Sequence, residues 1–501
     1  MNFPLVDQII IVVYILGVAA FGIYFSGKQK SLKDYFLGSK QIPWWAACFS
    51  VVATETSTLT FISIPGLAYI TNMNFLQLAM GFLIGRIIVA FVFIPRYYAG
   101  NMETAYEFLG NRFGTPMRKY SSITFIFLRI FADGVRLFTT AIPIKLITGL
   151  SYFESILIIG VITVVYSYVG GIKAVIWTDV VQMIIYFVGA TATIIVIYQL
   201  LPNGWTDVIH YASTDNKFQV FNFAFADSFS KFFTGGYNIV GGLIGGAFLA
   251  MASHGTDQMI VQRLLTCKDT KSSQKAVIGS GIIVLIQFGI FLLIGIMLYA
   301  LYEGVDYKTL IVGDHILTKP DEIFPKFIIQ NLPIGLAGLV VAGLLAASMS
   351  TLSSTFNSLA ATTMFDLFKR KGTPAIGTGE SSNRDLRYSR LATLFWAVVI
   401  VSTSMLFQSE TNPAVDYALK IQSLIYGGLL GVFLLGVAYK GAKLSDAVIS
   451  YSVSIFVLVL LFILPKFDII PALNLTWFTL FGVIIVFIIS TISVNVRKMF
   501  K

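Results

Sequence analysis

The chain has 501 residues, of which 56% are hydrophobic and only 12% are charged, and its mean hydropathy is +0.81. A soluble domain carries about a quarter charged residues, so this composition excludes an ordinary soluble protein. The apolar runs are continuous and do not alternate with polar residues, which predicts membrane-spanning helices rather than the strands of a barrel. The expected fold class is therefore all-α, in a polytopic membrane protein.

Thirteen apolar runs are long enough to span a bilayer. The first has no basic segment before it and no small-residue cleavage site after it, so it predicts a retained helix and not a signal peptide. The second and the ninth are too long for one straight span, which predicts a break or an extension in each. The runs lie near residues 5–25, 41–71, 74–97, 120–147, 151–170, 175–200, 232–260, 276–302, 328–366, 389–408, 413–438, 443–464 and 471–494.

The basic residues predict the orientation of these spans. With the N-terminus outside, 24 of the 35 Lys and Arg residues fall in inner loops and six in outer loops. This split follows the positive-inside rule and predicts a cytoplasmic C-terminus in a plasma or inner membrane. The net charge of +10 is then a topology determinant, and no nucleic-acid partner is expected. The expected partners are the lipid bilayer, sodium and a small solute, with no obligatory protein partner evident.

A polar stretch interrupts the second apolar run at membrane depth. Hydroxyls, a carboxylate and a helix breaker are tolerated there only where they face protein or a water-filled cavity. The stretch predicts a broken helix whose freed carbonyls and hydroxyls hold a cation; the alternative is a polar turn between two ordinary helices. It contains Thr54, Glu55, Thr56, Ser57, Thr58 and Thr60, followed by Pro65 and Gly66.

The run 232–260 predicts a second interrupted helix, five spans later. Its glycine pairs, from Gly235 to Gly246, are interpreted as close-packing points, since no phosphate-binding strand precedes them. Interrupted helices at corresponding positions of two halves indicate a transporter binding site.

Hydroxyl side chains gather on one face of a helix predicted over 342–358. A sodium ion prefers hard oxygen ligands, which hydroxyls and unpaired carbonyls supply without a buried net charge. The alternative is a packing seam of small residues. Asp179 lies just inside the sixth span and needs a partner, which a second cation shared with this face would provide. The helical spacing places on this face Ser350, Ser353, Ser354, Asn357 and Ser358, with Thr351 beside it.

Four motifs, in order along the chain, resemble the sodium/solute symporter family, which includes sodium/glucose, proline, monocarboxylate and sialic acid symporters. The resemblance implies a LeuT-type fold of two inverted five-helix repeats, here 41–200 and 232–438, within a single transporter domain of residues 1–501. One extra helix, 5–25, would precede the repeats and two, within 443–494, would follow them. The motifs are Ser50–Thr54, Gly170–Asp179, Thr256–Gln258 with Val261–Arg263, and Ser350–Thr351 with Phe356–Ser358.

The resemblance also implies ligands for one or two sodium ions. The family's common site falls on the backbone carbonyls of Ala53, Thr56 and Ala347 and on the hydroxyls of Ser350 and Thr351. A second site, known in only some members, falls on Asp179, Ser350, Ser353 and Ser354.

The solute site departs from the family pattern. Glu55 stands where sugar members have an asparagine, Ser253 and His254 stand where they have an aromatic gate, and Ala132 stands where sialic acid members have an arginine. We hypothesise that Glu55 accepts from hydroxyls or an amine and that Arg136 holds a carboxylate or phosphate. The candidate solute residues are Glu55, Ser57, Thr60, Arg136, Ser253 and His254.

An alternative is that the mid-membrane charges neutralise one another as structural ion pairs. These charges are Glu55, Arg86, Arg129, Asp133 and Arg136. Asp257 and Arg263 are interpreted as braces of a cytoplasmic gate.

The predicted function is sodium-coupled symport of a small polar organic solute, such as a sugar or sugar acid, by alternating access. A monocarboxylate or amino-acid solute is an alternative, as is a proton-coupled symporter using Asp179 or Glu55. A channel or a sensor is disfavoured, because no repeated carbonyl filter and no signalling domain are visible. No nucleophile–base set or metal spacing is visible, so no enzyme is predicted.

Overall fold

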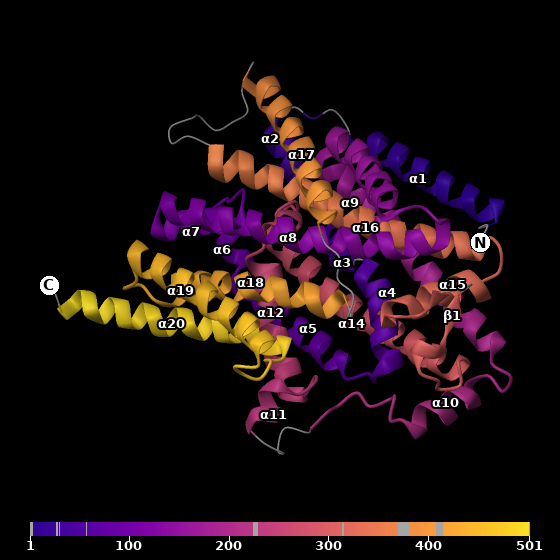
Figure 1. Ribbon diagram of the computed structural model, residues 1–501. Coiled ribbons are helices and arrows are strands. Elements are labelled where there is room, and N and C mark those ends of the chain that lie inside the picture. The colour runs from indigo at the N-terminus through magenta and orange to yellow at the C-terminus, as the bar shows by residue number, and fades with distance from the viewer. Residues whose placement is uncertain are drawn as a thin grey trace.

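The computed structural model describes residues 4–26, 29, 31–56, 58–223, 229–312, 315–368, 381–406 and 414–499. Its long helices lie side by side, with the N-terminus and the C-terminus at opposite ends of the bundle (Figure 1). We call the end where α1 and α16 begin the N-terminal face, and the end where α20 finishes the C-terminal face.

The helices of the first half begin with α1, which lies on the outside of the bundle. They are α1 (Leu5–Ser26), α2 (Leu32–Leu37), η1 (Gly38–Lys40), α3 (Trp44–Glu55), α4 (Thr58–Ile70), α5 (Phe75–Val92), α6 (Ile94–Ala99), α7 (Ala105–Phe113), α8 (Thr115–Thr148), α9 (Tyr152–Leu200), α10 (Trp205–Thr214) and α11 (Phe229–Thr234).

The second half contains the remaining helices and two short strands. They are η2 (Gly241–Gly245), α12 (Gly246–Gly255), α13 (Gln258–Leu264), α14 (Thr270–Leu301), η3 (Tyr307–Thr309), β1 (Ile311–Val312), β2 (His315–Ile316), η4 (Pro320–Glu322), α15 (Ile323–Asn331), α16 (Leu336–Thr362), η5 (Thr363–Phe368), α17 (Ser381–Ser404), α18 (Ala414–Ala438), α19 (Leu444–Ile463), η6 (Leu464–Phe467) and α20 (Leu475–Met499).

Within the described residues, seven helices are long and apolar enough to cross a membrane, and a bent pair makes an eighth. The pair is α3 with α4, which bend by 58° at the predicted break in the run 41–71. A polytopic helical membrane protein is therefore confirmed, while the count of thirteen spans and the inverted repeat stay predictions. The all-α class needs one small correction, because β1 and β2 form an antiparallel hairpin between α14 and α15.

Two glycines with positive φ lie where long helical runs are interrupted. The helix α9 has 49 residues, more than twice the length needed for one span, and Gly171 within it has φ 56° and ψ −156°. A Cβ at Gly171 would lie 2.5 Å from the carbonyl oxygen of Tyr35, so only glycine fits there. Gly335, with φ 88°, precedes α16 and separates it from α15 within the long run 328–366. Both breaks agree with the sequence, which predicts separate spans around Gly171 and an interruption in the longer run.

The later glycine pairs of the run 232–260, from Gly241 to Gly246, are close-packing points, as predicted, whereas a Cβ at Gly236 would have no neighbour within 4 Å. A Cβ at Gly242 would lie 2.8 Å from the Cβ of Gln77, and one at Gly246 would lie 2.6 Å from the carbonyl oxygen of Leu78. Since Gln77 and Leu78 belong to α5, the backbone of η2 and α12 lies directly against that helix. This contact brings the second interrupted helix beside the region where α3 ends.

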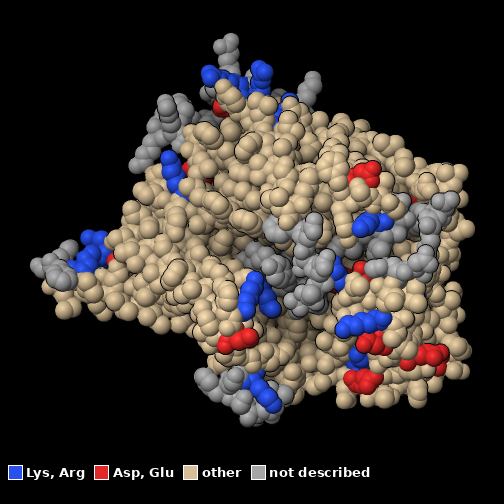
Figure 2. All heavy atoms as spheres, in the orientation of Figure 1, with Lys and Arg blue, Asp and Glu red and all other residues tan. Residues whose placement is uncertain are grey.

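Much of the surface suits a bilayer. Large apolar side chains on α1 are exposed, among them Leu5, Val13 and Leu16. The face of the molecule in Figure 2 is mostly uncharged, and the acidic side chains visible on it lie mainly towards α10 and β1. Cys48 and Cys267 are both buried and free.

Candidate functional site

Two helix breaks meet near the centre of the bundle. The helix α3 ends at Glu55, and α12 ends at Gly255, one residue after His254. The His254 Nε2 atom lies 3.6 Å from the Glu55 carboxylate. Arg86 of α5 is fully buried and donates to the same carboxylate, and its other terminal nitrogen donates to Ser280 at 3.0 Å. Two interrupted helices, distant in sequence, therefore share one charged cluster.

Thr351 of α16 faces the end of α3. Its hydroxyl lies 3.2 Å from the carbonyl oxygen of Thr54 and 3.2 Å from that of Ala347. Because α3 stops at Glu55, no following helical turn supplies backbone N–H groups to its last carbonyls. The structure thus brings three oxygens of the predicted first sodium region together: the Thr351 hydroxyl and the two carbonyls. Thr54, which belongs to the predicted cation-holding stretch but not to the ligand set implied by the family resemblance, supplies one of them.

The other members of the predicted first site are placed differently. Ala53 is buried in the last turn of α3, beside the carbonyl that Thr351 contacts. Thr56 follows the helix end with φ −74° and ψ 79°, and its hydroxyl bonds the Gln287 amide of α14 at 2.9 Å. Ser350 points to a neighbouring side of α16, where its hydroxyl donates to the Asp179 carboxylate. The two predicted sodium sites therefore lie on adjacent sides of α16, as Ser350 and Thr351 are consecutive.

Asp179 is the centre of a buried polar cluster. It accepts hydrogen bonds of 2.5 Å from Ser50 of α3 and from Ser350 of α16, so it joins three helices. Ser353 and Ser354 lie one turn further along α16, and both donate to the carbonyl oxygen of Ser350, at 3.0 and 2.5 Å. All four residues predicted for a second sodium site are therefore buried in one cluster.

A buried guanidinium belongs to this cluster, and the sequence analysis did not assign it there. Arg263 of α13 lies 3.4 Å from the Asp179 carboxylate, and it donates to Ser354 and, at 2.8 Å, to Ser50. The intramembrane carboxylate therefore has a protein cation as its partner. The spacing of Ser50 and Thr54, at i and i+4 on α3, was a signal that could have placed this helix face against α16.

The charges on α8 are paired, as the structural alternative predicted. Arg129 donates to Asp257, the N-cap residue of α13, and its second partner is the Tyr426 hydroxyl of α18 at 2.7 Å. Asp133 lies 3.4 Å from Arg129 and 2.9 Å from Arg136. Asp257 and Arg263, interpreted together from sequence as gate braces, thus hold different partners on different helices.

Arg136 is the least compensated of these guanidinium groups. Asp133 is its one ionic partner among the described residues, and its Nε atom is buried without a hydrogen-bond acceptor in the same set. Its side chain remains 14% exposed, whereas Arg86 and Arg129 are almost fully enclosed. Arg136 therefore keeps donor capacity for an anionic group.

The structure places the remaining candidate binding residues in different surroundings. Ser253 bonds the Nδ1 atom of His254 at 2.8 Å, which leaves the buried Nε2 atom directed towards Glu55. Thr60 is buried on α4, beyond the break. Ser57 lies outside the described residues. Asn357, on the hydroxyl face of α16, is not near Asp179 but accepts from Gln262 of α13 at 2.7 Å.

Hard, uncharged oxygens beside one buried carboxylate suit an alkali cation. Buried arginines and a histidine beside them suit a polar or anionic solute. The fold and these sites together define a polytopic helical membrane transporter. The profile of the sodium:solute symporter family matches residues 35–453, and the chain belongs to this family.

Several relatives are sodium-coupled transporters. The chain is 29% identical to a sodium/sialic acid symporter of Aliivibrio fischeri, with 91% of this chain and 87% of the relative aligned. It is 27% identical to a sodium/glucose cotransporter of Vibrio parahaemolyticus, with 98% and 91% aligned. A solved Na⁺-coupled sialic acid symporter, in a substrate-bound outward-open state, matches with a TM-score of 0.84 and 26% identity over 99% of this chain and 98% of that one. Family membership confirms sodium-coupled symport by a multi-pass membrane protein that is not an enzyme.

Proposed function

We propose that this symporter imports a small polar organic solute bearing a carboxylate, such as a sugar acid, by alternating access. The observation that carries the proposal is Arg136 of α8, a largely enclosed arginine whose Nε atom has no hydrogen-bond acceptor among the described residues. A guanidinium binds a carboxylate through two parallel hydrogen bonds, which neutral sugars cannot accept as strongly. Relatives that are sodium/sialic acid symporters support an acidic solute.

Sodium binds, in this proposal, where Thr351 and Ala347 of α16 meet the end of α3. Ala53, Thr56 and Ser350 complete the first site when the helix ends adjust around the ion. The contacts of Thr351 with the carbonyls of Thr54 and Ala347 support this placement. The ion can favour one conformation only through a higher affinity for it, and here it would hold the broken helix against α16.

A second sodium ion would use Asp179, Ser350, Ser353 and Ser354. Their burial in one cluster supports this site, and Arg263 would have to move away from Asp179 and Ser354 when the ion binds. The inverted repeats 41–200 and 232–438, with extra helices in 5–25 and 443–494, remain part of the proposal. The N-terminal face is proposed to be extracellular, and the C-terminal face cytoplasmic.

The solute is proposed to lie among Thr60, Arg136, Ser253 and His254. Glu55 is compensated by Arg86 and is near His254, so its carboxylate would accept from solute hydroxyls only in part. A monocarboxylate or amino acid would use the same arginine. A proton-coupled cycle through Asp179 or Glu55 is the second candidate, because the Asp179 carboxylate is fully buried and that of Glu55 is largely enclosed.

Uptake into proteoliposomes tests the proposal. We expect an inward sodium gradient to drive accumulation of sialic acid more effectively than of glucose, and replacement of sodium by choline at fixed pH to abolish it. Arg136→Gln should raise the half-saturating concentration of sialic acid about tenfold or more, which corresponds to the loss of one charged hydrogen bond. Arg384→Gln, an exposed arginine on α17, is the matched control.

Uptake that persists in choline and follows a proton gradient would favour the proton-coupled candidate. Unchanged half-saturation in both Arg136→Gln and Glu55→Gln would remove these two residues from the solute site.

A further inference from the structure

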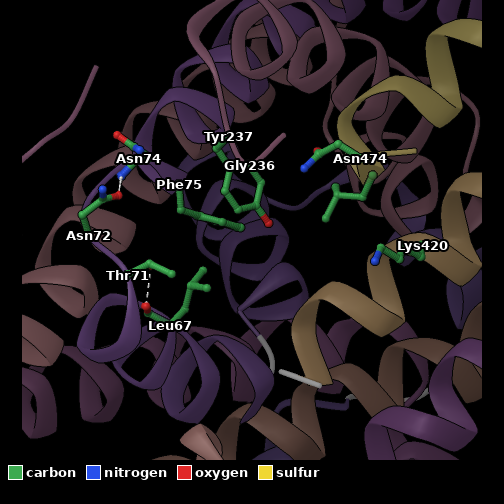
Figure 3. A pocket seen from close by; sticks show the side chains of 10 residues that line it. Leu67, Thr71, Asn72, Asn74, Phe75, Gly236, Tyr237, Lys420 and Asn474 are labelled. Carbon is green, nitrogen blue, oxygen red and sulfur yellow. Dashed lines mark hydrogen bonds between the residues drawn. The ribbon is translucent and has the colours of Figure 1, made fainter. Parts of the chain in front are cut away.

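A polar cavity opens at the N-terminal face, apart from the sites discussed above. It has a volume of about 350 Å³, and it lies where α4 leads into α5, beside α18 and the start of α20 (Figure 3). We call it the Lys420 cavity, after the lysine of α18 that lines it. Phe75, Gly236, Tyr237 and Asn474 also line it.

The walls of this cavity are held from two sides. The backbone N–H of Asn474 donates to the Phe233 carbonyl at 2.8 Å, and its side-chain amide donates to the Gly235 carbonyl at 2.8 Å. On the other side, the Gln77 amide donates to the Tyr237 carbonyl at 3.2 Å. The cavity is therefore built by fixed backbone and not by loose side chains.

One charge faces this space. Lys420 is the single Lys, Arg, Asp or Glu among the lining residues, and it makes no hydrogen bond or ion pair with the described side chains. In Figure 3 its side chain extends from α18 towards the side on which Gly236 and Phe75 lie. The side chain of Asp416, one helical turn earlier, lies outside the described set.

An aromatic wall stands near the lysine. The rings of Phe75 and Tyr237 meet edge to face, with centroids 5.1 Å apart. Aromatic faces and edges contact the C–H surfaces of a hydroxylated ring, while the ammonium attracts an anion as a point charge. A concave space with charge of one sign raises the local concentration of ligands of the other sign.

We propose that the Lys420 cavity is a binding subsite that captures an anionic, hydroxylated solute before it reaches Arg136. The inference rests on the proposed function for the direction of travel and for the acidic solute. The cavity itself, its fixed walls and its lysine are independent of that function.

The test uses a cysteine reporter in the full-length protein. Thr71 lines the cavity and is exposed, so Thr71→Cys places a thiol there, while Cys48 and Cys267 are buried and give little background. We measure how fast an uncharged maleimide labels this thiol in proteoliposomes, with sialic acid, lactate or glucose present.

We expect sialic acid to slow labelling at Thr71→Cys at least threefold, and glucose to have little effect. Lys420→Met should remove this protection, and Lys420→Arg should keep it. Protection should persist in Arg136→Gln, because the cavity does not use that arginine. In uptake, Lys420→Met should raise half-saturation for sialic acid roughly three- to tenfold with an unchanged maximal rate, as expected for losing one partly solvated charged contact.

Two controls sharpen the result. Lys466→Met removes an exposed lysine of η6 that does not line the cavity, and it should leave uptake and labelling unchanged. Asp416→Asn should preserve or strengthen protection, because it removes a negative charge one helical turn from Lys420.

Absence of protection by both anions would overturn the inference, and so would protection that is equally strong with and without the Lys420→Met substitution. If sodium drives no uptake but sialic acid still protects the reporter, the proposed function fails while the subsite stands.

Discussion

The guanidinium of Arg263 lies 3.4 Å from the carboxylate of Asp179, and both side chains are fully buried. Ser354 and Ser50 accept from the same arginine, and Ser50 also donates to Asp179. A protein cation thus faces ligands that the family resemblance assigns to a second sodium ion. In our proposal, movement of α13 would exchange one cation for the other.

Arg263→Gln tests this exchange. Removing one partner of a buried ion pair typically costs about 3–5 kcal/mol, because the remaining charge is left uncompensated. A sodium ion can replace the lost charge, so the thermal midpoint of Arg263→Gln should rise more steeply with sodium concentration than that of the unmodified protein. The double variant Asp179→Asn/Arg263→Gln should recover much of the stability. Equal sodium dependence in Arg263→Gln and the unmodified protein would contradict a shared site.

Thr351→Val should weaken sodium coupling. The substitution keeps the volume of the side chain but removes the hydroxyl that lies 3.2 Å from two carbonyl oxygens. We expect the sodium concentration for half-maximal uptake to rise about tenfold, the effect of losing roughly 1.4 kcal/mol of ligand interaction. Thr351→Ser should behave like the unmodified protein.

Thr362→Val is the matched control for this prediction. Thr362 is buried on the same helix, and its hydroxyl has no hydrogen-bond partner among the described atoms. A comparable loss of sodium affinity in Thr362→Val would show that Thr351 acts through packing and not as a ligand.

Asp7 should stabilise the sodium-binding helix from its N-terminal end. Its Oδ1 atom accepts from the backbone N–H groups of Gly335 at 2.7 Å and Gly338 at 2.6 Å, so a carboxylate on α1 caps α16. Asp7→Ala should lower the free energy of unfolding by about 1–2 kcal/mol, the usual cost of a lost helix cap. Asp7→Asn keeps an acceptor oxygen and should cost less. Unfolding measured in detergent by intrinsic fluorescence would give the values.

Gly338→Ala is an independent test of the contact between α1 and α16. A Cβ at Gly338 would lie 2.7 Å from the Cα atom of Asp7, so α1 would have to move away from α16. We expect destabilisation at least as large as that of Asp7→Ala. Gly289→Ala, on α14, is the control, because a Cβ there has no neighbour within 4 Å. An effect of Gly338→Ala no larger than that of Gly289→Ala would contradict the close approach.

Glu55→Gln should act mainly on stability. It leaves Arg86 buried with Ser280 but without its carboxylate, a loss of about 3–5 kcal/mol by analogy with other buried pairs. Glu55→Gln/Arg86→Met should recover part of this loss in the same unfolding measurement. If Glu55→Gln instead raises the half-saturating solute concentration at unchanged stability, Glu55 binds the solute directly.

The sequence predicted the broad architecture because its signals are local. Hydropathy and continuous apolar runs predicted membrane helices, and the polar stretch around Glu55 predicted the break that bends α3 against α4 by 58°. The 3.6-residue period placed Ser350, Ser353 and Ser354 on one buried face. The family motifs, in order along the chain, predicted the sodium-coupled class that the family match confirms.

The sequence by itself therefore determined that the chain is a helical membrane protein and where the segment 41–71 bends. Only the tertiary structure decided which charge faces which, since Asp179 meets Arg263 across 84 positions and Thr351 meets Thr54 across 297. Helical periodicity says which face of a helix is polar but not which neighbour covers it. In a low-dielectric interior every charge needs a partner, and the packing of helices distant in the chain selects that partner.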